Sequence, residues 1–281
     1  MHDGLATRLE LLTGIEPGPQ VVADALAAQR QRLLALLRTL DDQQWQTTSR
    51  CTEWTVHETV RHLVDVLHLS TAKYRHEPAV FEFEVPLDPR TEPRRWLERS
   101  AGQSSNETVA AFESAAAAEH VAFARLGSEG GDEQLMGAYG PLHWSVLGAH
   151  VFWDGWLHER DIVVPLGLPH ESTIAEDRLA ALYGLAIASL MSTFMGVPLA
   201  MTIELTGAAC ALYEIDAKDP SATIVRVATD AREADLRADL RAAVDFFAGR
   251  GDPSDLETIV DGRTDVAEPL TRLRTVMVPA S

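Results

Sequence analysis

Cysteine and basic residues are both scarce in this chain of 281 residues. Its two cysteines, Cys51 and Cys210, are too few for a disulfide framework or for a zinc site built from cysteine. The 24 lysine and arginine residues are outnumbered by 42 aspartate and glutamate residues, which gives a formal net charge of −18. Because proteins that neutralise phosphates carry a basic face, this balance argues against nucleic acid as a partner.

Long apolar runs are also missing. No segment approaches the roughly 18 uncharged apolar residues of a membrane-spanning helix, and the N-terminus lacks the basic-then-apolar pattern of a signal peptide. We therefore expect a cytoplasmic protein with no membrane partner. The hydrophobic content of 46% and the charged content of 23% are typical of globular proteins, and the length is sufficient for two hydrophobic cores.

The first 170 residues carry helical periodicity. A capping box at Thr55 and Glu58 marks one helix start, because the hydroxyl and the carboxylate each satisfy a free backbone N–H. Asn106 is expected to cap a later helix, and the glycine-rich segment 127–131 to end it. Four helices are predicted, at 21–40, 55–74, 107–126 and 143–164, with a long loop at 78–93. Four helices with one long connection favour a bundle with crossover topology.

The remaining residues mix helical and strand periodicity. A helix is predicted at 171–195, and the alternation of apolar and polar residues at 201–206 then predicts a half-buried strand. Further strands are predicted at 211–215, 223–228 and 256–260, and further helices at 231–248 and 266–273. The predicted fold class is therefore α+β in two domains, a helical bundle over residues 1–170 and a small α+β domain over residues 171–281.

A polar column is expected on the helix at 143–164. His150, Asp154 and His158 are four residues apart and therefore lie on one face of the helix, which Asp161 extends. Such a column is costly to bury unless its groups find partners. Two interpretations stay open from the spacing alone. Either these are hydrogen-bonded polar groups, or Asp154 and His158 hold a metal with a third ligand from another helix.

His62 is the natural third ligand. It lies inside the helix that begins at Thr55, beside the main apolar stripe of that helix. Histidines at such boundaries are also common without a metal, so this alternative stays open. His57 and His68, on the same helix, point elsewhere and are expected at the surface.

Two signatures in these helices resemble those of the mycothiol-dependent maleylpyruvate isomerase family. The run CTEWTVHETVRHL at 51–63 resembles the first, and Asp154, His158 and Asp161 match the second in order and spacing. The resemblance covers most of the chain, from about Val21 to Leu273. It includes the loop LDPRTEPRRW at 87–96, which resembles related actinobacterial proteins, and the segments TIELTG at 202–207 and FFAGRG at 246–251.

The resemblance implies a DinB-like four-helix bundle followed by a small α+β domain of sterol-carrier-like type. It also implies that His62, Asp154 and His158 bind zinc or another divalent metal, with Asp161 as a structural partner. One departure concerns the acidic ligand, which is usually glutamate in the family and is the shorter aspartate at position 154 of this chain. His150 is a substitute ligand if Asp154 does not reach the metal.

The chemistry implied by the resemblance begins with a thiol. Three protein ligands leave zinc an open position, and a thiol bound there becomes a nucleophilic thiolate at neutral pH. In the family the thiol is mycothiol, which adds to an activated double bond and leaves after the carbon skeleton has rotated. If the thiol stays on the small electrophilic substrate, the enzyme is a thiol S-transferase. A non-catalytic protein that binds a small molecule beside a weakened or empty metal site is the alternative.

Three further positions carry open alternatives. The resemblance places Arg250 at the active site as a catalytic residue that holds a carboxylate; otherwise it interacts with the dipole of a helix C-terminus. Arg94 and Arg95 lie on the long loop and are expected to be solvated rather than anion-binding. Cys51 precedes the helix of His62, so one alternative places it near the metal; because it has no visible partner base, we expect a buried structural thiol instead.

Overall fold

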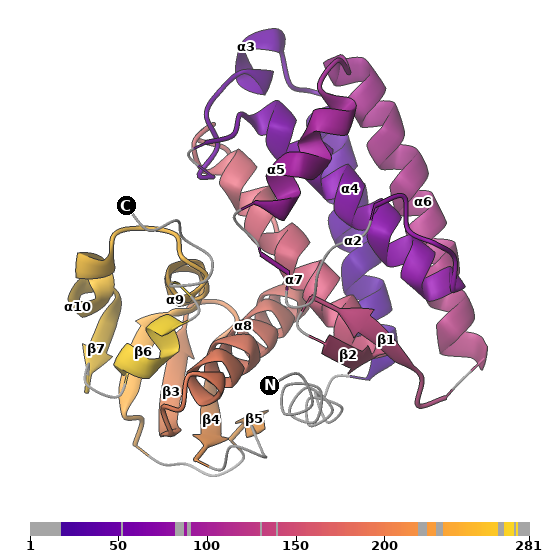
Figure 1. The fold of residues 1–281 in the computed structure, drawn as a ribbon. Helices are drawn as coiled ribbons and strands as arrows, with labels where there is room; N and C mark the ends of the chain where they lie inside the picture. Colours follow the sequence, from indigo (N-terminus) through magenta and orange to yellow (C-terminus); the bar gives the residue numbers. More distant parts are fainter. Residues whose placement is uncertain are drawn as a thin grey trace.

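A helical half and a half built around a sheet lie side by side in the chain (Figure 1). The computed structural model describes residues 18–51, 53–81, 87–88, 91–129, 131–138, 140–218, 224–228, 233–263, 267–272 and 274. The arrangement confirms the predicted α+β fold class. The predicted domain boundary at residue 170 stays a prediction.

Within the described residues, four long helices make the bundle, as the periodicity predicted. They are α2 (Pro19–Leu37), α4 (Val56–Arg75), α6 (Ser105–Glu129) and α7 (Trp144–Val163). Shorter elements join them: α3 (Asp42–Trp45), α5 (Glu92–Leu97) and the 3-10 helix η2 (Glu98–Ser100). The apolar stripe of α4 packs against α6 and α7, in a core that also contains Leu33 of α2; Leu33, Leu63 and Phe112 are each 1% exposed or less.

The predicted cap of α4 is confirmed. Thr55 Oγ1 accepts a hydrogen bond from the N–H of Glu58 (3.2 Å), and Glu58 Oε2 accepts one from the N–H of Thr55 (2.8 Å). This box fixes where the helix begins. It thereby places His62 two turns into α4, with its ring beside the ring of His158 on α7.

Three predicted boundaries in the bundle differ from the structure. The N-terminus of α6 is capped by Ser104, which forms a capping box with Glu107 (Ser104 N–H to Glu107 Oε2, 2.8 Å), and not by Asn106. The same helix passes through Gly127 and ends at Glu129, because one glycine inside a long helix costs only about 1 kcal/mol. The predicted loop at 78–93 is also shorter at its end, where α5 begins at Glu92.

Two glycines of α7 let neighbouring helices come close to it. A Cβ at Gly148 would collide with the ring of Phe123 on α6, and one at Gly155 would collide with the side chain of Arg30 on α2. Because the interior is close-packed, a side chain at either position would push these helices away from α7. The central position of α7 therefore depends on both glycines.

A hairpin that the sequence did not predict precedes α7. β1 (Gln134–Gly137) pairs antiparallel with β2 (Gly140–His143). Four residues a strand are too few for a clear period-2 pattern. The hairpin leads to His143, whose ring accepts a hydrogen bond from the N–H of Ser145 (3.3 Å) and caps α7.

The other half contains a five-stranded sheet with the order β5-β4-β3-β6-β7 in its described part. Its strands are β3 (Leu199–Thr206), β4 (Ala211–Ala217), β5 (Ile224–Val227), β6 (Leu236–Asp239) and β7 (Val260–Gly262). β3 pairs antiparallel with β4 and parallel with β6. The predicted helix at 171–195 corresponds to α8 (Ile174–Phe194), which contacts both α7 and the sheet and so joins the two halves.

Two predictions in this half are wrong. The segment 231–248, described from residue 233, is not one helix, because β6 comes first and α9 (Leu240–Phe247) then starts at its Asp239 cap. β6 alternates buried and exposed residues and is stabilised by its parallel neighbour β3, a tertiary interaction that local periodicity does not reveal. The segment 256–259 is the helix α10 (Leu256–Ile259) after the 3-10 helix η3 (Pro253–Asp255), and the strand β7 begins only at Val260.

Two further predictions fall partly outside the described residues. Of the predicted last helix at 266–273, the described part contains the 3-10 helix η4 (Glu268–Thr271), and Val266 and Leu273 lie outside it. The predicted strand at 223–228 corresponds to β5, with residue 223 outside.

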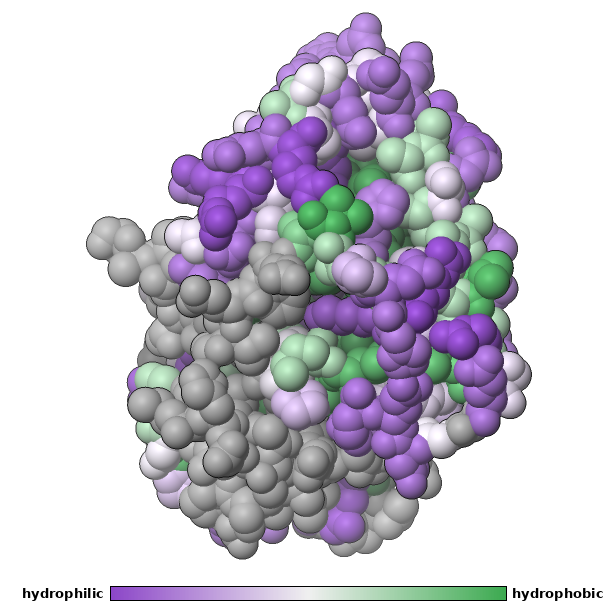
Figure 2. All heavy atoms as spheres, turned by 45° about the vertical axis from the view of Figure 1, so that its right-hand side comes forward, coloured by the Kyte–Doolittle hydropathy of each residue, from purple (hydrophilic) through white to green (hydrophobic). Residues whose placement is uncertain are grey.

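Hydrophilic side chains cover most of the described surface on the face in Figure 2, and apolar side chains form separate patches between them. Among the helices described, none is both long and apolar enough to cross a membrane. Most large apolar side chains are instead buried in two core clusters, one inside the bundle and one that extends from α7 to the sheet.

Candidate metal centre

The structure brings the three predicted metal ligands together. His62 projects from α4, and Asp154 and His158 project from α7, with one donor atom of each within 4.8 Å of the others. Nε2 of His158 lies 3.5 Å from Asp154 Oδ1, and the rings of His62 and His158 are 4.9 Å apart. Zinc takes nitrogen and oxygen ligands at about 2.0–2.2 Å, so small side-chain adjustments suffice for these donors to converge on one ion.

Polar atoms in this cluster need a further partner. Nδ1 of His62 and Oδ2 of Asp154 are buried and have no hydrogen-bond partner among the described residues. Buried polar atoms are nearly always paired, because leaving them unpaired is costly. A divalent cation between these side chains would supply the missing interaction, so the donor set fits a metal.

Asp161 fixes the orientation of His158. Its Oδ2 lies 3.0 Å from Nδ1 of His158, and a carboxylate at this nitrogen holds the ring hydrogen there and leaves Nε2 facing the cluster. Two guanidinium groups hold Asp161 in turn, Arg250 at 2.6 Å and Arg50 at 3.3 Å. Burial would raise the pKa of Asp161, but the charges of Arg250 and His158 lower it well below its usual range.

Without a metal, His158 is the protonated member of the three-donor cluster. Burial would lower the pKa of His158, but the negative charge of Asp154, the neighbouring Cys51 and the hydrogen bond with Asp161 raise it to about 10. Burial and the charge on His158 together lower the pKa of His62 to about 3. Burial would also raise the pKa of Asp154, yet the two histidines lower it. His158 therefore carries the proton that a metal must displace.

We expect metal binding near neutral pH to release about one proton, because a metal binds His158 only as a neutral imidazole. Below the raised pKa of His158, metal affinity should rise about tenfold for each pH unit. Calorimetric titration of the metal-free protein with zinc, in buffers of different ionisation enthalpy, counts the protons. Binding without proton release would contradict a protonated His158.

Arg250, the predicted catalytic residue, contacts Asp161 and does not belong to the three-donor cluster. Its Nε and Nη2 both donate to Asp161 (3.2 and 2.6 Å), and its Nη1 donates to the carbonyl of Ala248 (2.9 Å). These contacts favour neither of the two roles considered from the sequence. Through them the segment that follows α9 contacts Asp161, the carboxylate that orients His158.

Sequence reasoning missed a second set of charges in the same place. Asp245 on α9 accepts hydrogen bonds from Arg160 on α7 (2.5 Å) and from Arg50 (2.7 Å). Burial would raise the pKa of Asp245, but these two guanidinium groups lower it. No local pattern reveals these pairs, because Asp245 follows its partners by 85 and 195 positions. They join the C-terminal half to the bundle beside the residues that hold Asp161.

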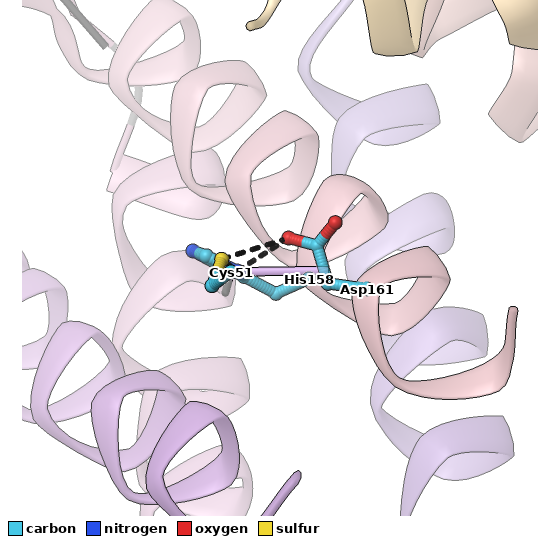
Figure 3. Close-up of side chains that lie close together, drawn as sticks. All are labelled: Cys51, His158 and Asp161. Atoms are coloured by element: carbon cyan, nitrogen blue, oxygen red, sulfur yellow. Dashed lines mark hydrogen bonds and ion pairs between the residues drawn. The ribbon is translucent and has the colours of Figure 1, made fainter. Parts of the chain in front are cut away.

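Cys51 is placed differently from its prediction. It is only partly buried, and its Sγ lies 3.3 Å from Asp161 Oδ2 and 3.7 Å from Nδ1 of His158 (Figure 3). In a nucleophile–histidine–carboxylate triad, the nucleophile and the carboxylate contact different nitrogens of the histidine ring. Cys51 and Asp161 both contact Nδ1 of His158, so these three residues do not form such a triad. A metal ion between Cys51, His158 and Asp161 is also disfavoured, because the positive charges of Arg50 and Arg250, which already pair with Asp161, would repel it. The expectation of a buried thiol without partners is wrong.

The remaining predicted candidates lie outside the three-donor cluster. Nδ1 of His150 lies 2.8 Å from the hydroxyl of Tyr183, so this ring already has a partner away from the cluster. His68 is exposed as expected, but His57 is half-buried, with Nε2 2.9 Å from Thr108 Oγ1. Arg94 and Arg95 are exposed and pair with carboxylates of their own neighbourhood, at Glu53 and Glu92.

Aromatic rings border the cluster on one side. The ring of Trp54 lies 5.1 Å from the ring of His62 and 6.3 Å from that of His158. Trp96 of α5 stacks on His62 at 6.3 Å, and Phe81 stacks on Trp96 at 4.5 Å. These contacts place aromatic rings directly beside both histidines of the cluster.

Comparisons with known proteins identify a family and a similar fold. Residues 26–163 match the family model described as the mycothiol maleylpyruvate isomerase N-terminal domain. The fold is similar to a crystal structure of a histidine-to-alanine mutant of the mycothiol-dependent maleylpyruvate isomerase, with a TM-score of 0.56, 13% identity, and coverage of 88% of this chain and 93% of that one. A second crystal structure of the mycothiol-dependent maleylpyruvate isomerase gives a TM-score of 0.54, 13% identity, and coverage of 84% and 91%. A search of curated proteins gives no match.

Proposed function

Through residues 26–163 the chain belongs to the mycothiol maleylpyruvate isomerase N-terminal domain family, and on this premise we propose that it is a metal-dependent enzyme that activates a low-molecular-weight thiol. The thiol in our proposal is mycothiol. The metal is zinc or another divalent ion, held by His62, Asp154 and His158. The observation that carries the proposal is the convergence of these three donors, with unpartnered polar atoms, from two helices.

The donor set fits catalysis better than a structural role. A metal with three protein ligands keeps one position open, where it lowers the pKa of a bound thiol and so supplies a thiolate. Asp161 keeps the hydrogen of His158 on Nδ1 and so keeps Nε2 available as a ligand. The rings of Trp54 and Trp96 both lie against His62 and add apolar surface beside the donors.

The aspartate at position 154 does not disrupt the cluster. Its Oδ1 is 3.5 Å from Nε2 of His158, and its side chain is 20% exposed. The shorter arm thus reaches the other donors from its place one helical turn before His158. This geometry argues against the alternative of a non-catalytic binding protein with a weakened metal site.

Isomerisation and thiol transfer differ only in what happens after the thiol has added to the substrate. A cis–trans isomerase releases the thiol after rotation of the carbon skeleton, and a transferase leaves it on the product. We favour isomerisation, because the two similar crystal structures are of an isomerase. Arg250 would serve either reaction as a residue that holds the centre in place through Asp161.

We expect metal-loaded protein to isomerise maleylpyruvate only when mycothiol is present, or to consume mycothiol with an activated electrophile. Absorbance follows the isomerisation, and titration of free thiol follows the consumption. Removal of the metal by a chelator should abolish both. Inertness towards a broad panel of electrophiles at full metal occupancy would contradict the proposal. Tight ligand binding that a chelator does not change would point to the non-catalytic alternative.

A further inference from the structure

The end of α9 and the residues that follow it are connected to Asp161 in two ways. The direct connection is made by Arg250, whose Nη2 donates to Asp161 Oδ2 (2.6 Å). The indirect one begins at Asp245, which accepts a hydrogen bond from Nη1 of Arg50 (2.7 Å). Nε of the same guanidinium group lies 3.3 Å from Asp161 Oδ1. The N–H of Arg250 also donates to the carbonyl of Asp245 (2.9 Å), so one short segment of the C-terminal half makes both connections.

Asp245 determines where the guanidinium group of Arg50 lies. Asp245 is 7% exposed, and it also accepts hydrogen bonds from Nε (3.0 Å) and Nη2 (2.5 Å) of Arg160. Without its carboxylate, Arg160 would have no acidic partner within the described residues, and Arg50 would keep only Asp161. Because buried charges need partners, Arg50 would then no longer be fixed between two carboxylates.

We propose that Asp245 is a positioning residue of the metal centre, which acts on the ring of His158 through its connection to Asp161. The inference rests on the proposed function, since it takes His158 as a metal ligand. Arg50, fixed by Asp245, restrains Oδ1 of Asp161. Oδ2 of Asp161 then keeps the ring of His158 turned with Nε2 towards Asp154. The C-terminal half thus contributes to metal binding, although all three donors come from the bundle.

Removal of the charge of Asp245 should weaken metal binding for two reasons. Arg50 restrains Asp161 less firmly, so the ring of His158 is less well oriented. The positive charges of Arg50 and Arg160 are also less compensated and repel a metal ion. We expect Asp245→Asn to lower the affinity for zinc about tenfold. This is the low end of the 10–100-fold loss that follows removal of a residue bonded directly to a ligand, because Asp245 acts from further away.

Asp177 supplies a matched control, because it also joins α9 to α7. It is 5% exposed and accepts hydrogen bonds from Nε of Arg241 on α9 (3.0 Å) and from Nε1 of Trp156 on α7 (3.1 Å). In the described part of the chain, no hydrogen bond or ion pair connects these two partners to Asp161. Asp177→Asn should therefore lower the stability of the fold, as Asp245→Asn does, but leave the affinity for zinc unchanged.

Two measurements without thiol test the inference. Competition titration with a chelator gives the zinc affinity of each full-length variant, and the absorption spectrum of the cobalt-loaded protein reports how the ligands are arranged. Asp245→Asn should change both, and Asp245→Glu, which restores the charge, should recover most of the affinity. Arg50→Gln breaks the same connection at its next residue and should cause a similar loss, so the test does not depend on the folding of one variant.

The outcomes separate the inference from the proposed function. Wild-type zinc affinity and an unchanged cobalt spectrum in Asp245→Asn and Arg50→Gln would overturn the inference, and so would an equal loss of affinity in Asp177→Asn. If the first two variants match the wild type while mycothiol coordinates the metal, the inference fails and the proposed function stands. If they lose affinity as expected but the wild type coordinates no thiol, the inference stands and the proposed function fails.

Discussion

Alanine in place of His158 is expected to leave the purified protein without its metal. The ring of His158 has Asp154 at one nitrogen (3.5 Å) and Asp161 at the other (3.0 Å), so it is the best-positioned of the proposed ligands. With only His62 and Asp154 left as ligands, metal affinity should fall more than about 100-fold. This exceeds the loss of about 10–100-fold expected when a residue that only hydrogen-bonds a ligand is removed. Elemental analysis of protein purified without a histidine tag should find near-stoichiometric metal in wild type and almost none in His158→Ala.

His68→Ala is the matched control for this experiment. His68 is exposed on the same helix as His62 and does not belong to the three-donor cluster. Its replacement should leave the metal content unchanged. Full metal content in His158→Ala, or equal loss in both variants, would show that the metal is bound elsewhere.

Removal of the Asp161 carboxylate is expected to have the largest effect on stability. Asp161 is completely buried and neutralises two guanidinium groups, those of Arg250 and Arg50, whose side chains are 12% and 19% exposed. Asp161→Ala leaves both groups without this partner, which should lower the free energy of unfolding by about 3–5 kcal/mol. It also frees Nδ1 of His158, which should weaken metal binding about 10–100-fold. Chemical denaturation and a competition titration with a chelator measure the two effects.

Two further variants separate these effects. Glu113→Ala breaks an ion pair with Arg38 in which both side chains are 53% exposed, and it should change stability by less than about 1 kcal/mol. Asp161→Ala combined with Arg250→Ala removes both charges and should recover part of the lost stability, although not the metal affinity. Unchanged metal affinity in Asp161→Ala would mean that this carboxylate does not hold His158.

Local patterns were sufficient to predict the bundle. The capping box at Thr55 and the apolar stripe behind it fix α4, and the four-residue spacing of Asp154 and His158 puts both side chains on one face of α7. His62 was the natural third candidate from its place inside α4, and the family resemblance then implied that it joins the ligands on α7. The structure places the three side chains together, and their role as metal ligands stays a prediction.

Tertiary contacts decide what the sequence did not reveal. β6 was taken for part of a helix because its pairing partner β3 lies 33 residues earlier, at Glu204 opposite Arg237. Cys51 lacked a visible partner because Asp161 and His158 are more than 100 positions away. The ion pairs of Asp245 depend in the same way on the packing of α9 near α7. Periodicity describes one element at a time and is silent about such neighbours.

Thiol coordination in the cobalt-substituted protein is the most direct test of the proposed function. Cobalt accepts the same imidazole and carboxylate ligands as zinc, and its absorption spectrum reports a bound thiolate. Mycothiol should add a sulfur-to-cobalt charge-transfer band to the spectrum of the wild-type protein, and no such band should form with His158→Ala. Wild-type protein that holds cobalt and shows no band at saturating mycothiol would contradict a metal-activated thiol.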